Sequence, residues 1–139
     1  MTIERLEGWE NRLEQVIESC RATPYVLGQH DCFRVACQAV EALTGIDRWP
    51  DFEGQYTSRR EALLLIAKYG SSFEEAFSWF FCVKPVSVGE ARRGDICAAK
   101  TEDGDMHLGV CLGVDSAFLG PEGLKFIPTL SCMYVWRIG

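Results

Sequence analysis

Cys32 and His107 are the residues of this chain whose types and positions could do acyl-transfer chemistry. Cys32 follows Asp31 within the run Gly28-Gln-His-Asp-Cys-Phe-Arg34, where a helix is predicted to begin. The free N–H groups at a helix N-terminus favour a thiolate over a thiol, and the same groups can stabilise a developing oxyanion. His107 opens an apolar run typical of a strand, and an imidazole within reach of the thiol could act as its base. The pair indicates a thiol hydrolase, although Cys32 could also simply begin the buried face of its helix.

Other side chains near Cys32 have both a structural and a catalytic interpretation. Asp31 is expected to cap the helix, which would also fix the pose of Cys32. Tyr25 could place a phenol near the thiol as an oxyanion donor, or it could be a half-buried aromatic residue. His30 is a second candidate base, but its side chain would have to fold back past Asp31, so we assign it to the substrate groove. Residues 25–28 are expected to form a short extended entry into the motif, with Gly28 assigned to the substrate groove or its support.

Apolar periodicity and capping signals predict the elements that position these residues. Helices are expected over the first ~20 residues, from residue 32 towards 43, from 58 to 70, and from 71 or 72 to about 81. Apolar strands separated by turn residues are expected at 96–99, 107–112, 116–119, 124–127 and 134–138. A helical half followed by a β half predicts an α+β fold, in a single domain over residues 1–139. Four large aromatic residues could line a substrate groove or fill the core between the halves, and we expect the core: Trp49, Phe52, Tyr56 and Trp79.

Composition and charge narrow the class of protein. The 139 residues are 47% hydrophobic and 24% charged, which fits one globular domain. The net charge of −6 argues against a nucleic-acid partner, because phosphate binding needs a basic face. We find no signal peptide and no apolar run long enough to span a bilayer, so we expect cytoplasmic synthesis and no membrane partner. Without a secretion signal, the seven cysteines are expected to be reduced thiols. They include no C-x-x-C spacing, so we expect no metal, and we expect no other cofactor.

Three segments together resemble NlpC-type papain-like cysteine peptidases, in particular short phage and prophage tail-associated members. The run Tyr25-Val-Leu-Gly-Gln-His-Asp-Cys32 is similar to their nucleophile segment, in which a Tyr and a Gly turn precede an Asp-Cys pair that opens a helix. The run Arg93-Gly-Asp-Ile-Cys97 looks like their Gly-Asp strand, and His107-Leu-Gly-Val-Cys-Leu-Gly113 looks like their His strand. The order of Cys before His also fits, and the resemblance covers roughly residues 23 to 115.

The resemblance implies a papain-like fold, with N-terminal helices packed on a C-terminal antiparallel sheet or half-barrel. It implies Cys32 as nucleophile, His107 as base and Tyr25 as an oxyanion donor. The implied reaction is amide hydrolysis in peptidoglycan stem peptides through a thioester, by a protein carried on a virion tail. Two alternatives remain: a catalytically inactive papain-like fold that serves as a structural component of a phage tail, and an intracellular thiol hydrolase with another substrate.

The chain departs from the family pattern at two places. The family usually has Ser-Gly after Asp-Cys, whereas this chain has Phe33-Arg34, which narrows the approach to the thiol. A polar third catalytic residue is expected near residue 119, where the chain is apolar. Asp115 or Ser116 would then have to orient the imidazole, unless a backbone carbonyl or a water does so.

Overall fold

Residues 3–139, which the computed structural model describes, form four α-helices followed by a six-stranded antiparallel sheet. The α+β class predicted from the sequence is therefore confirmed. The helices are α1 (Trp9–Ala22), α2 (Cys32–Thr44), α3 (Arg59–Tyr69) and α4 (Phe73–Phe81). The strands are β1 (Pro85–Val86), β2 (Ile96–Lys100), β3 (Met106–Cys111), β4 (Asp115–Gly120), β5 (Gly123–Pro128) and β6 (Tyr134–Trp136). Short 3-10 helices lie at Trp49–Asp51, Val88–Glu90 and Thr129–Ser131 (η1, η2 and η3).

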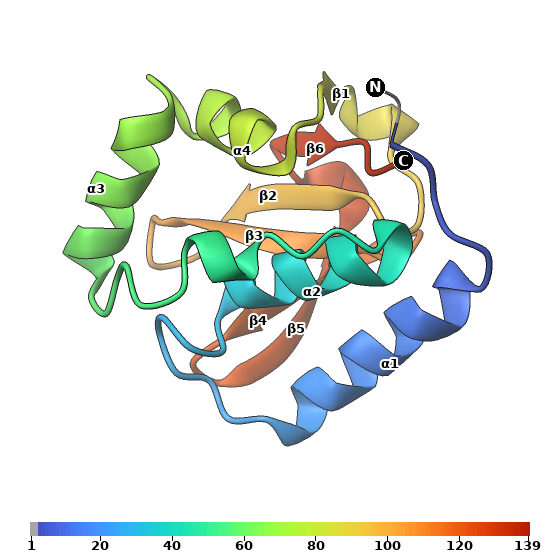
Figure 1. The fold of residues 1–139 in the computed structure, drawn as a ribbon, viewed down its shortest axis with the longest axis horizontal. Helices are drawn as coiled ribbons and strands as arrows, with labels where there is room; N and C mark the ends of the chain where they lie inside the picture. The colour runs from blue at the N-terminus through green and yellow to red at the C-terminus, as the bar shows by residue number, and fades with distance from the viewer. Residues whose placement is uncertain (1–2) are drawn as a thin grey trace.

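The sheet has the strand order β1-β6-β2-β3-β4-β5, and β2 and β3 form a hairpin along their whole length. By contrast, β3 pairs with β4 only at its far end, through Val110 with Ala117 and Cys111 with Ser116. In the part of the chain that the structure describes, residues 106–109 of β3 therefore have no strand partner along the edge that faces β4. Helix α2 runs across this part of the sheet (Figure 1).

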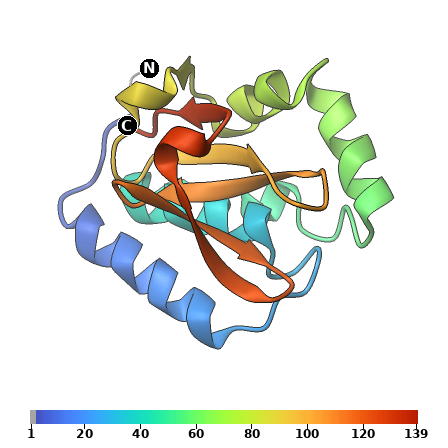
Figure 2. The same ribbon diagram turned by 180° about the vertical axis from the view of Figure 1, so that it is seen from behind.

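Helices α1 and α2 cover one face of the sheet, whose other face is seen in Figure 2. Helix α2 buries its apolar stripe, including Val35, Ala39 and Leu43, against this face. The stripe recurs every three or four residues, as the sequence predicted. The start of α1 differs from the prediction: the helix begins at Trp9 because Gly8, with φ of 78°, breaks the helical backbone before it.

The large aromatic residues follow the prediction in three cases out of four. Trp49, Phe52 and Tyr56 are buried in the core, whereas Trp79 is 61% exposed, so the prediction for Trp79 is wrong. Helix α4 turns its residues 76, 77, 80 and 81 inwards, and position 79 falls outside that stripe. Trp79 instead packs on Tyr69 of α3, with ring centroids 4.9 Å apart.

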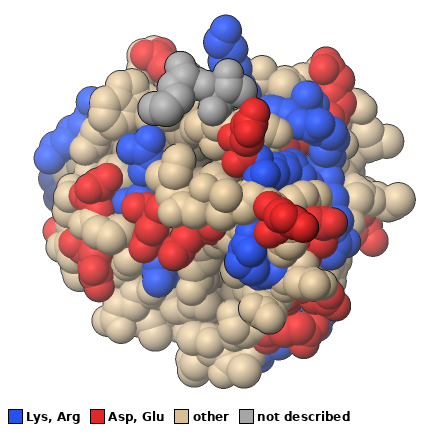
Figure 3. All heavy atoms as spheres, turned by 45° about the vertical axis from the view of Figure 1, so that its right-hand side comes forward, with Lys and Arg blue, Asp and Glu red and all other residues tan. Residues whose placement is uncertain are grey.

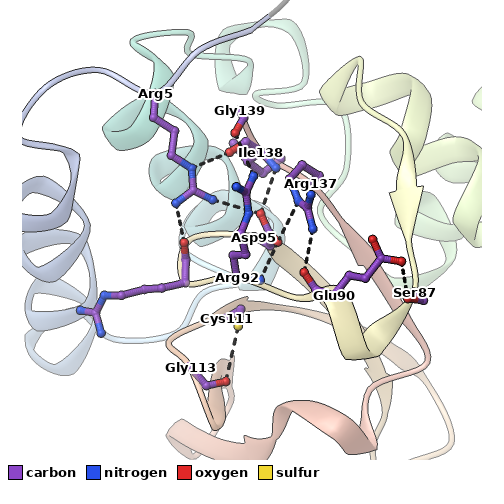
Figure 4. Close-up of polar contacts among 11 residues, drawn as sticks. Arg5, Ser87, Glu90, Arg92, Asp95, Cys111, Gly113, Arg137, Ile138 and Gly139 are labelled. Carbon is purple, nitrogen blue, oxygen red and sulfur yellow. Dashed lines mark hydrogen bonds and ion pairs between the residues drawn. The ribbon is translucent and has the colours of Figure 1, made fainter.

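A buried carboxylate joins the two ends of the chain to the start of β2 (Figure 4). Asp95 is fully buried and accepts hydrogen bonds from the backbone N–H groups of Arg92 (2.8 Å) and Ile138 (3.1 Å). The guanidinium of Arg5 donates to it at 3.1 Å, and that of Arg137 lies 3.6 Å away. The Gly-Asp motif noticed in the sequence thus provides a structural anchor.

The surface around the chain termini carries charges of both signs. Basic and acidic side chains are intermingled on the face that Figure 3 brings forward. No helix in the described part of the chain has the length and apolar character needed to cross a membrane.

Candidate active site

A cavity of about 350 Å³ opens at the N-terminal end of α2. Cys32 and Tyr25 line it from the side of α2 and the preceding loop, and His107 lines it from the β2–β3 hairpin. Most of the remaining wall comes from α3 and α4, with Tyr56 and Pro121 completing it. In Figure 1 the start of α2, the β2–β3 turn and α3 lie towards the same side of the molecule. Three of the four residues predicted to be catalytic therefore share one cavity.

Asp31 fixes the start of α2 through three hydrogen bonds. Its Oδ1 accepts from the backbone N–H of Arg34 (2.9 Å), as expected of an N-cap. Its Oδ2 accepts from the backbone N–H of Gly28 (2.8 Å) and from the hydroxyl of Tyr56 (2.6 Å). Asp31 is buried and its oxygens are taken up by these donors, so it holds Cys32 in place and is a positioning residue.

Gly28 is required by the backbone at the turn before the helix. Its φ is 84°, a left-handed conformation that favours glycine. A Cβ at this position would also collide with the carbonyl oxygen of Tyr56. The close approach of the two segments brings the Tyr56 hydroxyl to Asp31.

Cys32 is half-buried as a residue, and its thiol is buried against strand β3. Burial raises its pKa to about 12, and the neighbouring carboxylate of Asp31 adds to the rise. Hydrogen bonds from the backbone of Leu108, Phe33 and Cys32 itself lower the pKa and so oppose this rise. The helix N-terminus therefore favours the thiolate as predicted, but desolvation outweighs it and the resting thiol is protonated. Leu108, which follows His107 in β3, is thus one of the backbone groups beside the sulfur, and both Cys32 and His107 line the cavity.

His107 is paired with Asp103, a carboxylate that the sequence analysis did not assign to the site. The Nε2 atom of His107 lies 3.1 Å from Oδ2 and 3.3 Å from Oδ1 of Asp103. If Nε2–H donates this bond, Nδ1 is the unprotonated nitrogen and can accept a proton. Asp103 also lines the cavity. The turn between β2 and β3 is what brings position 103 back onto position 107.

The carboxylate of Asp103 is stabilised in its ionised form. The hydroxyl of Thr101 (2.5 Å), the backbone N–H of Asp105 (2.9 Å) and the ring of His107 lower its pKa to about 2. By composition alone, the run Asp103-Gly-Asp105 indicates only a turn between two strands. A histidine four residues after a turn aspartate, at the start of a strand, is the signal that could have identified the pair.

Tyr25 stands close to the other polar residues of the cavity. Burial raises its pKa to about 12, and the nearby Cys32, Asp31 and Asp103 add to the rise in that order. The phenol is therefore protonated at neutral pH and remains a hydrogen-bond donor. The charges of both Cys32 and Asp103 therefore influence the phenol of Tyr25.

Asp115 and Ser116 do not orient His107, contrary to expectation. His107 lies near one end of β3, whereas residues 115 and 116 begin β4 beside Cys111, at the other end. Asp115 is exposed, and the buried Ser116 hydroxyl bonds to Thr129 at 2.8 Å. The sheet register therefore separates both residues from the cavity.

His30 is buried and does not line the cavity, so the structure does not bring it together with Cys32 and His107 there. Its backbone forms an isolated bridge to Val26. Desolvation lowers its pKa. Among residues 3–139 no group of three or more His, Cys, Asp or Glu is arranged to hold a metal ion.

The two residues that replace the family's Ser-Gly are held by other contacts. The ring of Phe33 packs among aromatic rings, including those of Phe52 (5.3 Å between centroids) and Phe80 (5.6 Å). The guanidinium of Arg34 lies over the ring of Trp49 at 5.2 Å. Phe33 still lines the cavity, whereas Arg34 does not.

The fold and the cavity define an α+β protein in which a cysteine at a helix N-terminus shares a cavity with a histidine–aspartate pair. The chain matches the model of a family described as a domain of unknown function (DUF6950) over residues 4–138. Because the match covers nearly the whole sequence, the chain belongs to this family. Among curated proteins, no sequence matches it significantly.

Proposed function

We propose that this protein is a cysteine hydrolase with a papain-like fold, in which Cys32 attacks a carbonyl carbon and His107 acts as its base. The observation that supports this most directly is the His107–Asp103 pair (3.1 Å) in the same cavity as a cysteine at the N-terminus of α2. A nucleophile, a base and a group that orients the base are the parts that acyl transfer needs.

The residues present can carry both halves of the reaction. Nδ1 of His107 takes the Cys32 proton as the sulfur forms a bond to the carbonyl carbon, and the phenol of Tyr25 and the α2 N–H groups face the developing oxyanion. The imidazolium then gives its proton to the leaving nitrogen or oxygen as that bond breaks, which leaves a thioester. Water attacks the thioester with His107 as base, the carboxylic acid departs and the thiol is restored. Since the raised pKa keeps the resting thiol neutral, proton removal must accompany attack.

A catalytically inactive tail component is the second candidate, and one observation favours it. Burial raises the pKa of Cys32 to about 12, which is the behaviour of an inert thiol. The acetyl-transfer experiment described next distinguishes the active hydrolase from the inactive tail component.

The test follows acetyl transfer from p-nitrophenyl acetate in the wild-type protein and in Cys32→Ala, His107→Ala and Cys82→Ala. Cys82 is an exposed thiol outside the cavity and provides the matched control. We expect the acetyl group on Cys32 by peptide mass spectrometry. Nitrophenol release should be abolished in Cys32→Ala, reduced about 10²-fold or more in His107→Ala and unchanged in Cys82→Ala. An unmodified Cys32 with no loss of rate in Cys32→Ala would favour the inactive tail component.

Peptidoglycan stem peptides and a place on a phage tail are predictions that rest on the resemblance alone. A digest of purified peptidoglycan by the wild-type protein and by Cys32→Ala tests the first. Copurification with virions tests the second.

A further inference from the structure

We propose that the site is selective for an apolar acyl group without a carboxylate, such as an aliphatic chain joined to the reacting carbonyl. The inference rests on the proposed hydrolase function and narrows its substrate class. It also departs from peptidoglycan stem peptides, which carry free carboxylates.

The wall of the cavity that faces the start of α2 is built from apolar side chains. Helix α4 contributes the aromatic rings of Phe73, Phe77 and Phe80, and α3 contributes Leu65 and Ile66. These residues pack on the main core, so the wall is backed by a fixed structure. A space of about 350 Å³ with such a wall is of the size and character of a small-molecule pocket.

The charged side chains around the cavity disfavour an anionic substrate. Among the described lining residues, the one arginine or lysine is Arg59, and it is engaged by Asp105. Its Nε donates to Oδ2 at 2.6 Å, and its Nη2 donates to the other carboxylate oxygen. Asp103 is ionised on the same rim, because its hydrogen bonds hold its pKa at about 2. A substrate carboxylate would meet two carboxylates and no unpaired cation.

A substitution at Leu63 can change the preference for uncharged substrates without disturbing the core. It lines the cavity yet is 47% exposed, so a lysine there can place its ammonium at the opening. The neighbouring Leu64 is 56% exposed on the same helix and does not line the cavity. Leu63→Lys and Leu64→Lys therefore add the same charge to the same helix at different places.

The experiment compares p-nitrophenyl hexanoate with mono-p-nitrophenyl adipate, which has the same chain length and ends in a carboxylate. Rates are taken as the difference between the wild-type protein and Cys32→Ala. We expect kcat/KM for the hexanoate to exceed that for the adipate by at least about tenfold. This ratio should fall in Leu63→Lys and stay unchanged in Leu64→Lys. Cys32-dependent hydrolysis with equal rates, or an equal effect of the two lysines, would overturn the inference and leave the hydrolase function standing.

A binding measurement keeps the inference testable if no ester is hydrolysed. Hexanamide and the monoamide of adipic acid are titrated into Cys32→Ala protein, and the methyl signals of Ile66 and Leu63 are followed by NMR. Selective shifts with hexanamide would support the apolar pocket even where the hydrolase proposal has failed. The absence of shifts with hexanamide, or equal shifts with both amides, would overturn it.

Discussion

At the scale of single residues, the chemistry depends on which carboxylate faces the imidazole of His107. Asp103 lies 3.1 Å from Nε2, whereas Asp115 is exposed at the start of β4. An acceptor at Nε2 holds the proton there and leaves Nδ1 as the basic nitrogen. Asp103 is therefore a positioning residue whose effect acts through His107.

We predict that Asp103→Ala lowers kcat/KM for Cys32-dependent ester hydrolysis at least about tenfold, because the imidazole loses the acceptor that fixes its tautomer. Asp103→Asn keeps an oxygen acceptor and should retain more of the activity. The matched control is Asp115→Ala, for which we expect no change. The measurement is the pH–rate profile of each variant. A profile for Asp103→Ala identical to that of the wild type would show that the pair does not contribute.

The hydrogen bonds to Asp103 also predict a pH dependence of folding. The pKa of Asp103 is about 2 in the folded protein, below the value of about 3.9 for an unperturbed aspartate. Its stabilising effect is therefore fully present above the unfolded pKa and is lost as the pH falls from about 4 towards 2. Thr101→Val removes the hydroxyl donor and should raise the pKa towards its ordinary value. Carboxyl ¹³C NMR titration measures this directly, with Asp105, whose pKa is lowered by Arg59, as the internal control.

At the scale of elements, the position of α2 depends on the tight turn that precedes it. Gly28 donates its backbone N–H to Asp31, and Asp31 in turn bonds to Arg34 and Tyr56. The start of α2 is thereby tied both to its own loop and to the segment before α3. A disturbance at Gly28 should move Cys32 as well as destabilise the fold.

Gly28→Ala is predicted to be more destabilising than Gly54→Ala. Both glycines have positive φ, 84° and 78°, so each alanine incurs a left-handed penalty of about 1–2 kcal/mol. At Gly28 the Cβ also collides with the backbone of Tyr56, whereas at Gly54 it meets open space. Urea denaturation should give a free energy of unfolding at least about 1 kcal/mol lower for Gly28→Ala than for Gly54→Ala. Equal values would mean that the loop relaxes around the new methyl group.

At the scale of the whole molecule, Asp95 joins the N-terminal segment, strand β2 and the C-terminal residues through one buried carboxylate (Figure 4). A buried charge is tolerated only where it is paired and hydrogen-bonded, as this one is by Arg5 and two backbone N–H groups. Asp95 therefore holds together two segments, around Arg5 and around Ile138, that lie far from it in the sequence.

We predict that Asp95→Asn lowers the free energy of unfolding by about 3 kcal/mol, because it leaves the partly buried guanidinium of Arg5 without its counter-charge. Asp115→Asn, at an exposed aspartate, should change it by less than about 0.5 kcal/mol. Chemical denaturation followed by circular dichroism measures both. A loss as small as that of the control would indicate that hydrogen bonds, rather than charge, anchor the ends of the chain.

Much of the fold could be predicted from local sequence signals. Asp31 and Ser58 mark helix starts because their side chains accept from backbone N–H groups three residues later, and the structure has both bonds. Apolar periodicity located α2 and the strands on either side of Asp103-Gly-Asp105. These features depend on residues within a few positions of one another, which is why the sequence alone determined them.

The composition of the site was decided by tertiary structure. The sequence predicted Cys32 at the start of a helix. Its burial against β3, which raises its pKa to about 12, depends on a strand that lies more than seventy residues later in the sequence. The exclusion of Asp115 follows from the sheet register, and the apolar wall follows from how α3 and α4 pack. Desolvation and charge proximity depend on distance in space, so only the folded chain determines which of its carboxylates, thiols and rings act together.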